Sequence, residues 1–392
     1  MQRKNGLFIL ISFILFVSGC GGGSTDFSSG SNTPPVQSLH RGQLLGSRLL
    51  SNDAQSISYE VKAYKIIYAT SNVKNKIIKA SGLLAIPQKA TGEKSPLLSY
   101  QHGTTFLDKD APSNSASTIS GIKTLASTGY IVSAPDFIGY GESASTIHPY
   151  MHANSLASAS IDMLRASKAF LKKHNIPLNS QLFLTGYSEG GYATIAMQKA
   201  LLEKHRNEFK VTASSAGAGP YDLSQTAKTL ANKVTNNKPS YMSFLLKAYD
   251  ETYQLNAISS MYQTAYIPVI NRSFDGKHSG GEIDRSLSHT TTKLFKAPFL
   301  SALQGNGNHV MLEKLAENNL YDWKPLAPTR FYHSPQDETV PYANSRKAFD
   351  TMTENGAENI SLQDCFLNTH VSCALPYVLD TLNYFRRYAN DL

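Results

Sequence analysis

Apolar residues follow two different spacings along this chain of 392 residues. Two runs at 61–69 and 76–86, with Ser71-Asn72 near the turn, predict an antiparallel pair of strands. Short apolar runs typical of buried strands follow at 96–101, 129–135, 181–185, 211–216, 329–333 and 360–363. Segments with helical spacing lie between several of them, at 118–127, 155–173 and 192–204. This alternation predicts an α/β fold with a mostly parallel sheet and helices on both faces.

The strand at 181–185 runs into Gly186-Tyr187-Ser188-Glu189-Gly190-Gly191, which contains a Gly-x-Ser-x-Gly pattern. Small residues around the serine let the backbone make a tight turn from strand to helix, and this turn exposes the serine hydroxyl. Ser188 then lies at the N-terminus of the 192–204 helix, where free N–H groups favour a developing negative charge. The pattern therefore predicts a nucleophile elbow.

His102-Gly103-Thr104-Thr105 directly follows the strand at 96–101. In the fold that an elbow implies, this loop supplies one backbone N–H to an oxyanion hole, and the residue after the nucleophile supplies another. We assign these two donors to Thr104 and Glu189. His102 is interpreted as a residue that shapes the loop, because its position in the chain order does not suit the general base.

A serine hydroxyl needs an imidazole to take its proton, and the imidazole needs a carboxylate that fixes its tautomer. Asp337 lies in the loop that leaves the strand at 329–333, and His370 follows the last strand, at 360–363. The order Ser188, Asp337, His370 is the order in which α/β-hydrolases carry these residues. We interpret Ser188 as the nucleophile, His370 as the general base and then acid, and Asp337 as the orienting carboxylate.

Other carboxylates compete for the last of these roles. Asp222 is the strongest rival to Asp337, because the strand before it also ends near the elbow helix. Glu338 and Asp364 are weaker candidates. The position of Asp337 directly after a predicted parallel strand favours it, since ligands and catalytic groups gather at the carboxyl ends of such strands.

Together these motifs resemble the α/β-hydrolase superfamily, and within it the secretory-lipase type of exported esterases. The matching segments are His102-Gly103-Thr104, the 136–143 loop with His148-Pro149-Tyr150, Gly186 to Gly191, Gly219-Pro220-Tyr221-Asp222, and Asp337 through Val340-Pro341. The resemblance covers roughly residues 95–222 and 328–388. It implies hydrolysis of carboxylic esters through an acyl-enzyme, without a metal or cofactor.

A long insertion separates two strands of the predicted sheet, from residue 223 to about 325. It contains an apolar and aromatic helical pattern at 241–249 and a Gly- and Ser-rich patch at 276–281. We predict a mainly helical cap over the active site, with some of its apolar side chains lining an acyl pocket. Residues 39–222 and 326–392 then form the catalytic domain.

The chain begins like an export signal. Arg3 and Lys4 precede an uncharged, largely apolar run at 6–17, which is shorter than the roughly 20 residues that a membrane-spanning helix needs. Val17-Ser18-Gly19-Cys20 resembles the lipobox of bacterial lipoproteins. This resemblance implies cleavage before Cys20 and lipidation of that cysteine. The alternative is a plain secretory signal with an incidental cysteine.

The segment after the predicted signal peptide (1–19) is rich in Gly, Ser, Thr, Asn and Pro as far as residue 38. Such a composition buries too little apolar surface to fold, so residues 20–38 are predicted to form a flexible, lipidated tether. We therefore expect an exported protein that is lipid-anchored to a bacterial membrane. The absence of aspartate at position 21 is compatible with the outer membrane.

Two cysteines remain after Cys20, and they lie on either side of His370. An even pair in an exported chain favours a disulfide between Cys365 and Cys373, which would hold the loop that carries His370. Two separate buried thiols are the alternative, and an oxidising compartment disfavours them.

Two other functional classes are weighed against an ester hydrolase on the same fold. A serine peptidase of the aminoacyl or prolyl type would use the same three residues on the same fold, although no acidic cluster indicates a pocket for a free amino terminus. A catalytically inactive module that serves adhesion is opposed by the presence of Ser188, Asp337 and His370 in order. An ester hydrolase remains the leading hypothesis, with the peptidase as its alternative.

Charge and histidine spacing bear on the remaining partners. Loss of the signal peptide removes the two positive charges of Arg3 and Lys4, which lowers the formal net charge from +8 to +6. No Lys/Arg block is present, so we expect no nucleic-acid binding.

His148 and His152 have the spacing of a metal-binding pair, but a proline follows His148 and the segment is predicted to be a loop, so we expect no metal site there. The expected partners are an ester substrate and a membrane.

Overall fold

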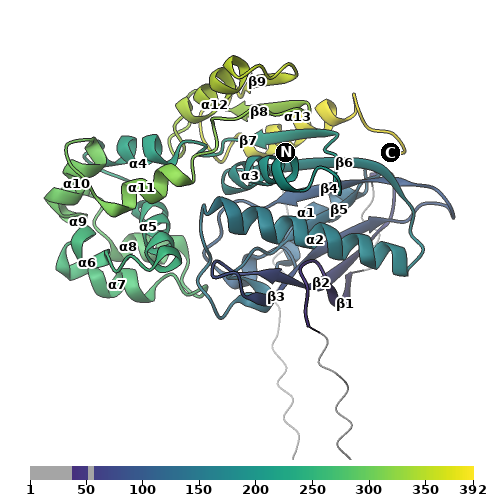
Figure 1. Cartoon of the computed structure of the whole chain (residues 1–392), viewed down its shortest axis with the longest axis horizontal. Coiled ribbons are helices and arrows are strands. Elements are labelled where there is room, and N and C mark those ends of the chain that lie inside the picture. The colour runs from purple at the N-terminus through teal and green to yellow at the C-terminus, as the bar shows by residue number, and fades with distance from the viewer. Residues whose placement is uncertain (1–37, 52–56) are drawn as a thin grey trace, which may run out of the picture. The chain divides into compact units, whose positions relative to one another are not determined.

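Across the described residues, nine strands form a sheet in the order β1-β2-β3-β5-β4-β6-β7-β8-β9 (Figure 1). The computed structural model describes residues 38–51 and 57–392. Pairing is antiparallel from β1 to β5 and parallel from β5 through β4 to β9. The strands are β1 Leu44–Ser51, β2 Val61–Ser71, β3 Ile77–Pro87, β4 Ser95–Gln101, β5 Ile131–Pro135, β6 Leu178–Tyr187, β7 Ala213–Gly217, β8 Thr329–His333 and β9 Ile360–Asp364.

The apolar runs form the central strands because helices cover both faces of the sheet. All five residues of β5 and of β7 are buried, as are Leu182, Phe183 and Leu184 in β6. A parallel strand that is covered on both faces is buried at every position, so its sequence does not alternate between apolar and exposed polar residues. The predicted α/β class with a mostly parallel sheet is confirmed.

The two faces of the sheet carry different helices and separate hydrophobic clusters. Helices α2 (Ala153–Lys173) and α3 (Glu189–Lys204) pack on one face, and α1 (Ala116–Ala126) and α13 (Ala374–Phe385) on the other. Helix α12 (Ala343–Glu354) packs near β8 and β9. Residues Leu39–Leu392 thus form one compact unit with its own core. In the part of the chain that the structure describes, no helix is both long and apolar enough to cross a membrane.

Several elements differ from the pattern-based expectation. The apolar pattern predicts neither β1 nor α12, because an edge strand and a one-sided surface helix keep much of their surface in water. The elbow helix begins at Glu189 rather than Tyr192, although two glycines follow. Glycine disfavours helix formation, so tertiary contacts determine this boundary. The predicted signal peptide, Cys20 and the predicted tether up to residue 37 lie outside the described residues.

Within residues 223–325, all of which the structure describes, eight α-helices follow β7 and precede β8. Figure 1 shows them in green, gathered at one side of the sheet. They are α4 Leu223–Ala231, α5 Pro239–Tyr253, α6 Ile258–Met261, α7 Ile267–Arg272, α8 Gly280–Ser286, α9 Thr291–Leu294, α10 Ala297–Gln304 and α11 Val310–Glu317. The insertion therefore adds a helical body to the α/β unit.

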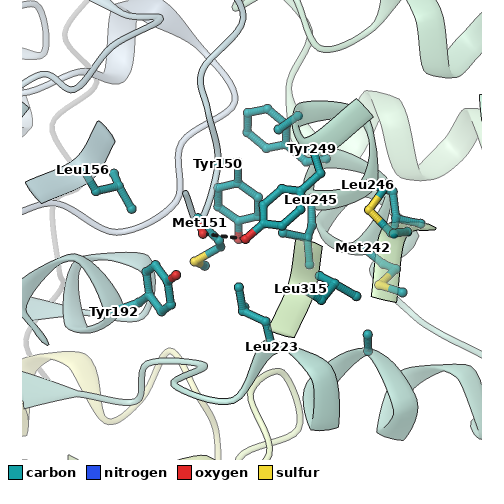
Figure 2. Close-up of a cluster of buried hydrophobic side chains, with 14 of the residues drawn as sticks. Tyr150, Met151, Leu156, Tyr192, Leu223, Met242, Leu245, Leu246, Tyr249 and Leu315 are labelled. Atoms are coloured by element: carbon teal, nitrogen blue, oxygen red, sulfur yellow. Dashed lines mark hydrogen bonds between the residues drawn. The ribbon is translucent and has the colours of Figure 1, made fainter. Parts of the chain in front are cut away.

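The insertion packs on the α/β unit through a buried apolar cluster (Figure 2). Leu246 and Tyr249 from α5 have no exposed surface, and neither has Tyr192 from α3. The hydroxyl of Tyr249 donates a hydrogen bond of 2.9 Å to the backbone carbonyl of Met151, which lies just before α2. The contact thus combines apolar burial with a satisfied polar group.

We expect Leu246→Ala to lower the free energy of unfolding by about 2–5 kcal/mol, because the substitution leaves a cavity in this cluster. Val234→Ala, in the same insertion, removes methyl groups from a side chain that is 79% exposed. It should change the stability by no more than about 0.5 kcal/mol. Urea denaturation followed by circular dichroism measures both variants. Equal effects of the two would contradict a tightly packed interface.

Candidate active site

Ser188 lies on the turn between β6 and α3 and has φ 61° and ψ −122°. Few residues with a side chain adopt positive φ, and such strain gathers at functional sites. The N–H of Ser188 donates to the carbonyl of Gly217 in β7 at 2.8 Å, which holds the turn against the sheet. A Cβ atom on Gly190 would overlap the carbonyl oxygen of Gln101, so this position needs glycine.

The structure brings three side chains from distant segments together at the C-terminal edge of the sheet. The Oγ of Ser188 lies 2.9 Å from the Nε2 of His370. The Nδ1 of the same imidazole lies 2.6 Å from the Oδ2 of Asp337. His370 is largely buried and the Asp337 side chain has no exposed surface, whereas Ser188 is half-buried. The geometry allows proton transfer from the hydroxyl to the imidazole.

Asp337 is surrounded by donors. Its Oδ1 accepts hydrogen bonds from the backbone N–H groups of Thr339 and Val340, at 2.9 Å and 2.7 Å. Its Oδ2 faces the imidazoles of His370 and His333. Burial raises the pKa of the carboxyl, but the hydrogen bonds from His333 and His370 outweigh burial and hold the pKa below its usual value. Asp337 is thus an anion that its surroundings orient.

His333, for which no motif indicates a role, ends β8 and has no exposed surface. Its Nε2 lies 3.1 Å from the Oδ2 of Asp337, and its Nδ1 lies 2.8 Å from the Oγ of Ser345 in α12. The spacing of four residues between His333 and Asp337, at the end of a buried strand, is the sequence signal that could have indicated it. His333 thus contacts the same carboxylate oxygen as His370 and helps to position it.

Four contacts fix the loop that carries His370. Cys365 and Cys373 are joined by a disulfide, with their Cα atoms 6.1 Å apart. The backbone N–H of His370 donates to the carboxylate of Glu338 at 2.9 Å, and its carbonyl accepts from the hydroxyl of Tyr187 at 2.8 Å. The Ser334 hydroxyl donates to the carbonyl of Leu367 at 2.7 Å. The imidazole therefore projects from a restrained backbone.

The two assigned oxyanion donors lie on either side of the elbow. Glu189 is the first residue of α3, and Thr104 follows Gly103, where a Cβ atom would lie 3.2 Å from the carbonyl oxygen of Tyr187. This close approach brings the Thr104 loop to the turn that holds Ser188. Among the described residues, neither backbone N–H donates to another group. Both N–H groups are thus free to bind an anionic oxygen.

The side chain of Glu189 is fully buried, and its Oε1 lies 2.7 Å from the Nε2 of His148. The Nδ1 of His148 lies 2.6 Å from the carbonyl of Ile138, which can only accept, so Nδ1 carries a proton. One further proton must then lie between Nε2 and the carboxyl group. Whichever atom holds that proton, the pair has no net charge.

The other polar residues weighed in the sequence have different partners. Asp222 caps α4 by accepting from the N–H of Gln225 at 2.9 Å, and it also binds the ammonium group of Lys347 at 2.5 Å. The Nδ1 of His152 lies 2.9 Å from the hydroxyl of Ser155. The imidazole of His102 lies within hydrogen-bond distance of the carbonyls of Gly103 and Asp136. None of these contacts places Asp222, His102 or His152 on the hydroxyl of Ser188.

Comparison with known sequences identifies related proteins. The sequence profile of the secretory lipase family matches residues 114–390. The secreted triacylglycerol lipase LIP5 of Malassezia furfur is 22% identical over 278 residues, which cover 67% of this chain and 66% of that protein. Lipase A of Moesziomyces aphidis is 26% identical over 203 residues, which cover 49% of this chain and 42% of that protein. The chain thus spans less than two thirds of either relative.

Solved structures support the same fold. The rice cell wall degrading esterase LipA from Xanthomonas oryzae superposes with a TM-score of 0.80 at 28% identity, and the match covers 89% of this chain and 98% of that chain. Candida antarctica lipase A in its closed state gives a TM-score of 0.70 at 16% identity over 89% of this chain and 82% of that chain. The second likeness concerns the fold alone. The predicted α/β-hydrolase fold is confirmed.

The depressed pKa of Asp337 has a consequence for stability. An unfolded aspartate titrates near pH ~3.9, so the carboxylate stabilises the folded chain above that pH and loses this effect as the pH falls through the lower, folded pKa. The difference in unfolding free energy between the unsubstituted chain and Asp337→Asn should therefore shrink as the pH falls from about 7 to about 3. Urea denaturation at several pH values measures it. Asp350→Asn, which alters an exposed ion pair with Arg346, is the control and should show no such trend.

Proposed function

Because the chain belongs to the secretory lipase family, we propose that it is a serine hydrolase that cleaves carboxylic esters. The contact between Ser188 and His370, with Asp337 on the far nitrogen of the imidazole, is the observation that carries the proposal. A hydroxyl, an imidazole and a carboxylate in this series form the apparatus for acyl transfer. The relatives that match are lipases and an esterase, which favours esters over the amide bonds of the peptidase alternative.

In the proposed first half of the reaction, the Oγ of Ser188 attacks the ester carbonyl while the Nε2 of His370 takes the hydroxyl proton. Asp337 holds the imidazole in the tautomer with a proton on Nδ1 and stabilises the imidazolium that forms. The tetrahedral intermediate then collapses. His370 gives the proton to the leaving alcohol, and the acyl group remains on Ser188.

The negative charge of the tetrahedral intermediate is proposed to lie between the backbone N–H groups of Thr104 and Glu189. Neither N–H donates to another of the described residues, and Glu189 also begins α3, where the helix dipole favours negative charge. Removing one such donor typically costs about a hundredfold or more in rate. The neutral pairing of Glu189 with His148 means that no net side-chain charge opposes the oxyanion at this point.

The second half returns the enzyme to its starting state. Water attacks the acyl group on Ser188, His370 takes a proton from the water, and the serine leaves with that proton as the carboxylic acid departs. An alcohol in place of water would give acyl transfer by the same steps. No step requires a group beyond the side chains and backbone of this chain.

The relatives and the N-terminal sequence support a proposal for the substrate and the place of action. One relative is named a triacylglycerol lipase and another a cell wall degrading esterase, so the test includes both short and long acyl esters. We propose that the chain is exported and held at a bacterial membrane through lipidated Cys20, with residues 223–325 as the cap beside the site. A tether over 20–38 would keep the enzyme near the membrane surface.

Ser188→Ala tests the proposal directly. Hydrolysis of p-nitrophenyl esters from acetate to palmitate should fall by about a thousandfold or more in this variant, because the nucleophile is gone. Circular dichroism should show an unchanged fold. The chain length with the highest kcat/KM separates a short-acyl esterase from a lipase. Full activity in Ser188→Ala would contradict the proposed mechanism.

The Glu189 and His148 pair yields a rescue experiment. His148→Gln takes away the shared proton and allows a buried negative charge at Glu189, so kcat should fall by about tenfold or more. Adding Glu189→Gln to that variant removes the charge and should restore most of the rate. Glu189→Gln alone is the matched control. If the double variant stays as slow as His148→Gln, the histidine acts by packing and the electrostatic explanation is wrong.

A further inference from the structure

Exposed apolar side chains are concentrated beside the candidate active site. Of the twelve large apolar side chains exposed among the described residues, five lie between residues 366 and 379. They are Phe366 (89% exposed), Leu367 (47%), Val371 (70%), Leu375 (69%) and Leu379 (56%). Single exposed apolar residues are ordinary, whereas a contiguous group marks an interaction surface. We call these five residues the 366–379 patch.

The patch is held in a fixed shape by the loop that carries His370. Phe366, Leu367 and Val371 lie between the two cysteines of the disulfide. The N–H of Ala374 donates to the carbonyl of Val371, so the turn at 371 runs directly into α13. Leu375 and Leu379 are four residues apart in α13, which places them in one row on the helix surface, and Val371 lies in the turn just before it.

The charge around the patch is also unusual. Residues 365–379 contain no Asp, Glu, Lys or Arg, and Asp380, which follows Leu379, is paired with Arg330 at 2.9 Å. Exposed Arg386 and Arg387 follow α13, and Arg386 continues the helical row from Leu379 at a spacing of seven residues. An apolar row that ends in basic side chains is the arrangement by which helices bind the surface of an anionic bilayer.

From this geometry we propose that the 366–379 patch docks on the surface of a phospholipid bilayer, with Arg386 among the head groups. The inference rests on the proposed ester hydrolysis, because docking at this place would bring lipid-borne esters to the segment that carries His370. The predicted lipid tether would hold the enzyme at the same membrane. A lipid surface therefore explains the apolar side chains, the missing charges and the neighbouring arginines together.

A second copy of the chain is the other occupant to consider. It would bury the apolar side chains equally well, but it would cover the loop on which the general base sits, and residues 365–379 of a second copy would offer Arg386 and Arg387 no acidic partner. A bilayer requires no such partner from the protein. The arrangement therefore favours lipid over self-association.

The test uses residues 39–392, which form a compact unit with its own core and lack the predicted lipid anchor. All binding variants also carry Ser188→Ala, so that the vesicle lipids stay intact. Sedimentation with large unilamellar vesicles of phosphatidylglycerol and phosphatidylcholine measures the partition coefficient. Leu375→Gln together with Leu379→Gln should lower it by about tenfold or more, because two apolar side chains no longer leave water.

Matched variants separate the possible results. Leu326→Gln changes a leucine that is 64% exposed and precedes β8, at the N-terminal ends of the parallel strands, away from the edge that carries Ser188. This variant should leave vesicle binding unchanged. In a background that keeps Ser188, the double variant should hydrolyse dissolved p-nitrophenyl acetate at the unsubstituted rate. If the unsubstituted enzyme also fails to hydrolyse this ester, the result refutes the proposed function rather than the docking on lipid. Arg386→Gln should weaken binding to phosphatidylglycerol by about fivefold.

Three outcomes would overturn the inference. The unsubstituted 39–392 unit could fail to bind either kind of vesicle. The double variant could bind as well as the Leu326→Gln control. Light scattering during gel filtration could show a dimer that the double variant dissociates, which would assign the patch to a second copy of the chain.

Discussion

The backbone strain at Ser188 is the constraint on which the site depends. A residue with a side chain held at φ 61° and ψ −122° carries a cost of about 1–3 kcal/mol, which persists only where the surroundings prevent relaxation. Here β6 and α3 enter and leave the turn, β7 accepts its N–H, and Gly190 allows the backbone of β4 to approach. The hydroxyl consequently stands at the C-terminal edge of the sheet with its position determined by four elements.

Charge at this edge is arranged in two different ways. Asp337 is kept ionised by two backbone N–H groups and two imidazoles, despite its burial. Glu189 is buried as well, but it shares a proton with His148 and so forms a neutral pair. The two carboxyl groups differ in their partners, because Asp337 accepts from four groups, whereas Glu189 contacts His148 alone and its Oε2 has no partner among the described residues. A negative charge therefore lies next to the Nδ1 of His370, whereas the Glu189–His148 pair adds no net charge near the proposed oxyanion hole.

The loop at 365–373 carries both His370 and three residues of the 366–379 patch. Its disulfide, the carboxylate of Glu338 and the hydroxyl of Tyr187 restrain its backbone, and His370 points inward to Ser188. The same loop carries Phe366, Leu367 and Val371 of the 366–379 patch, all of them exposed. One restrained loop thus holds both the proposed general base and part of the apolar surface.

The sequence by itself determined the α/β-hydrolase class, the elbow and the order of serine, carboxylate and histidine, because apolar runs and glycine-flanked turns are local properties of the chain. Only the tertiary structure decided which carboxylate meets the imidazole, since Asp337 and Asp222 both follow strands and differ only in their partners. The contacts of His333 and of His148 depend in the same way on distant segments. The start of the elbow helix and the edge strand β1 also escaped prediction, because packing and solvent exposure set them rather than local spacing.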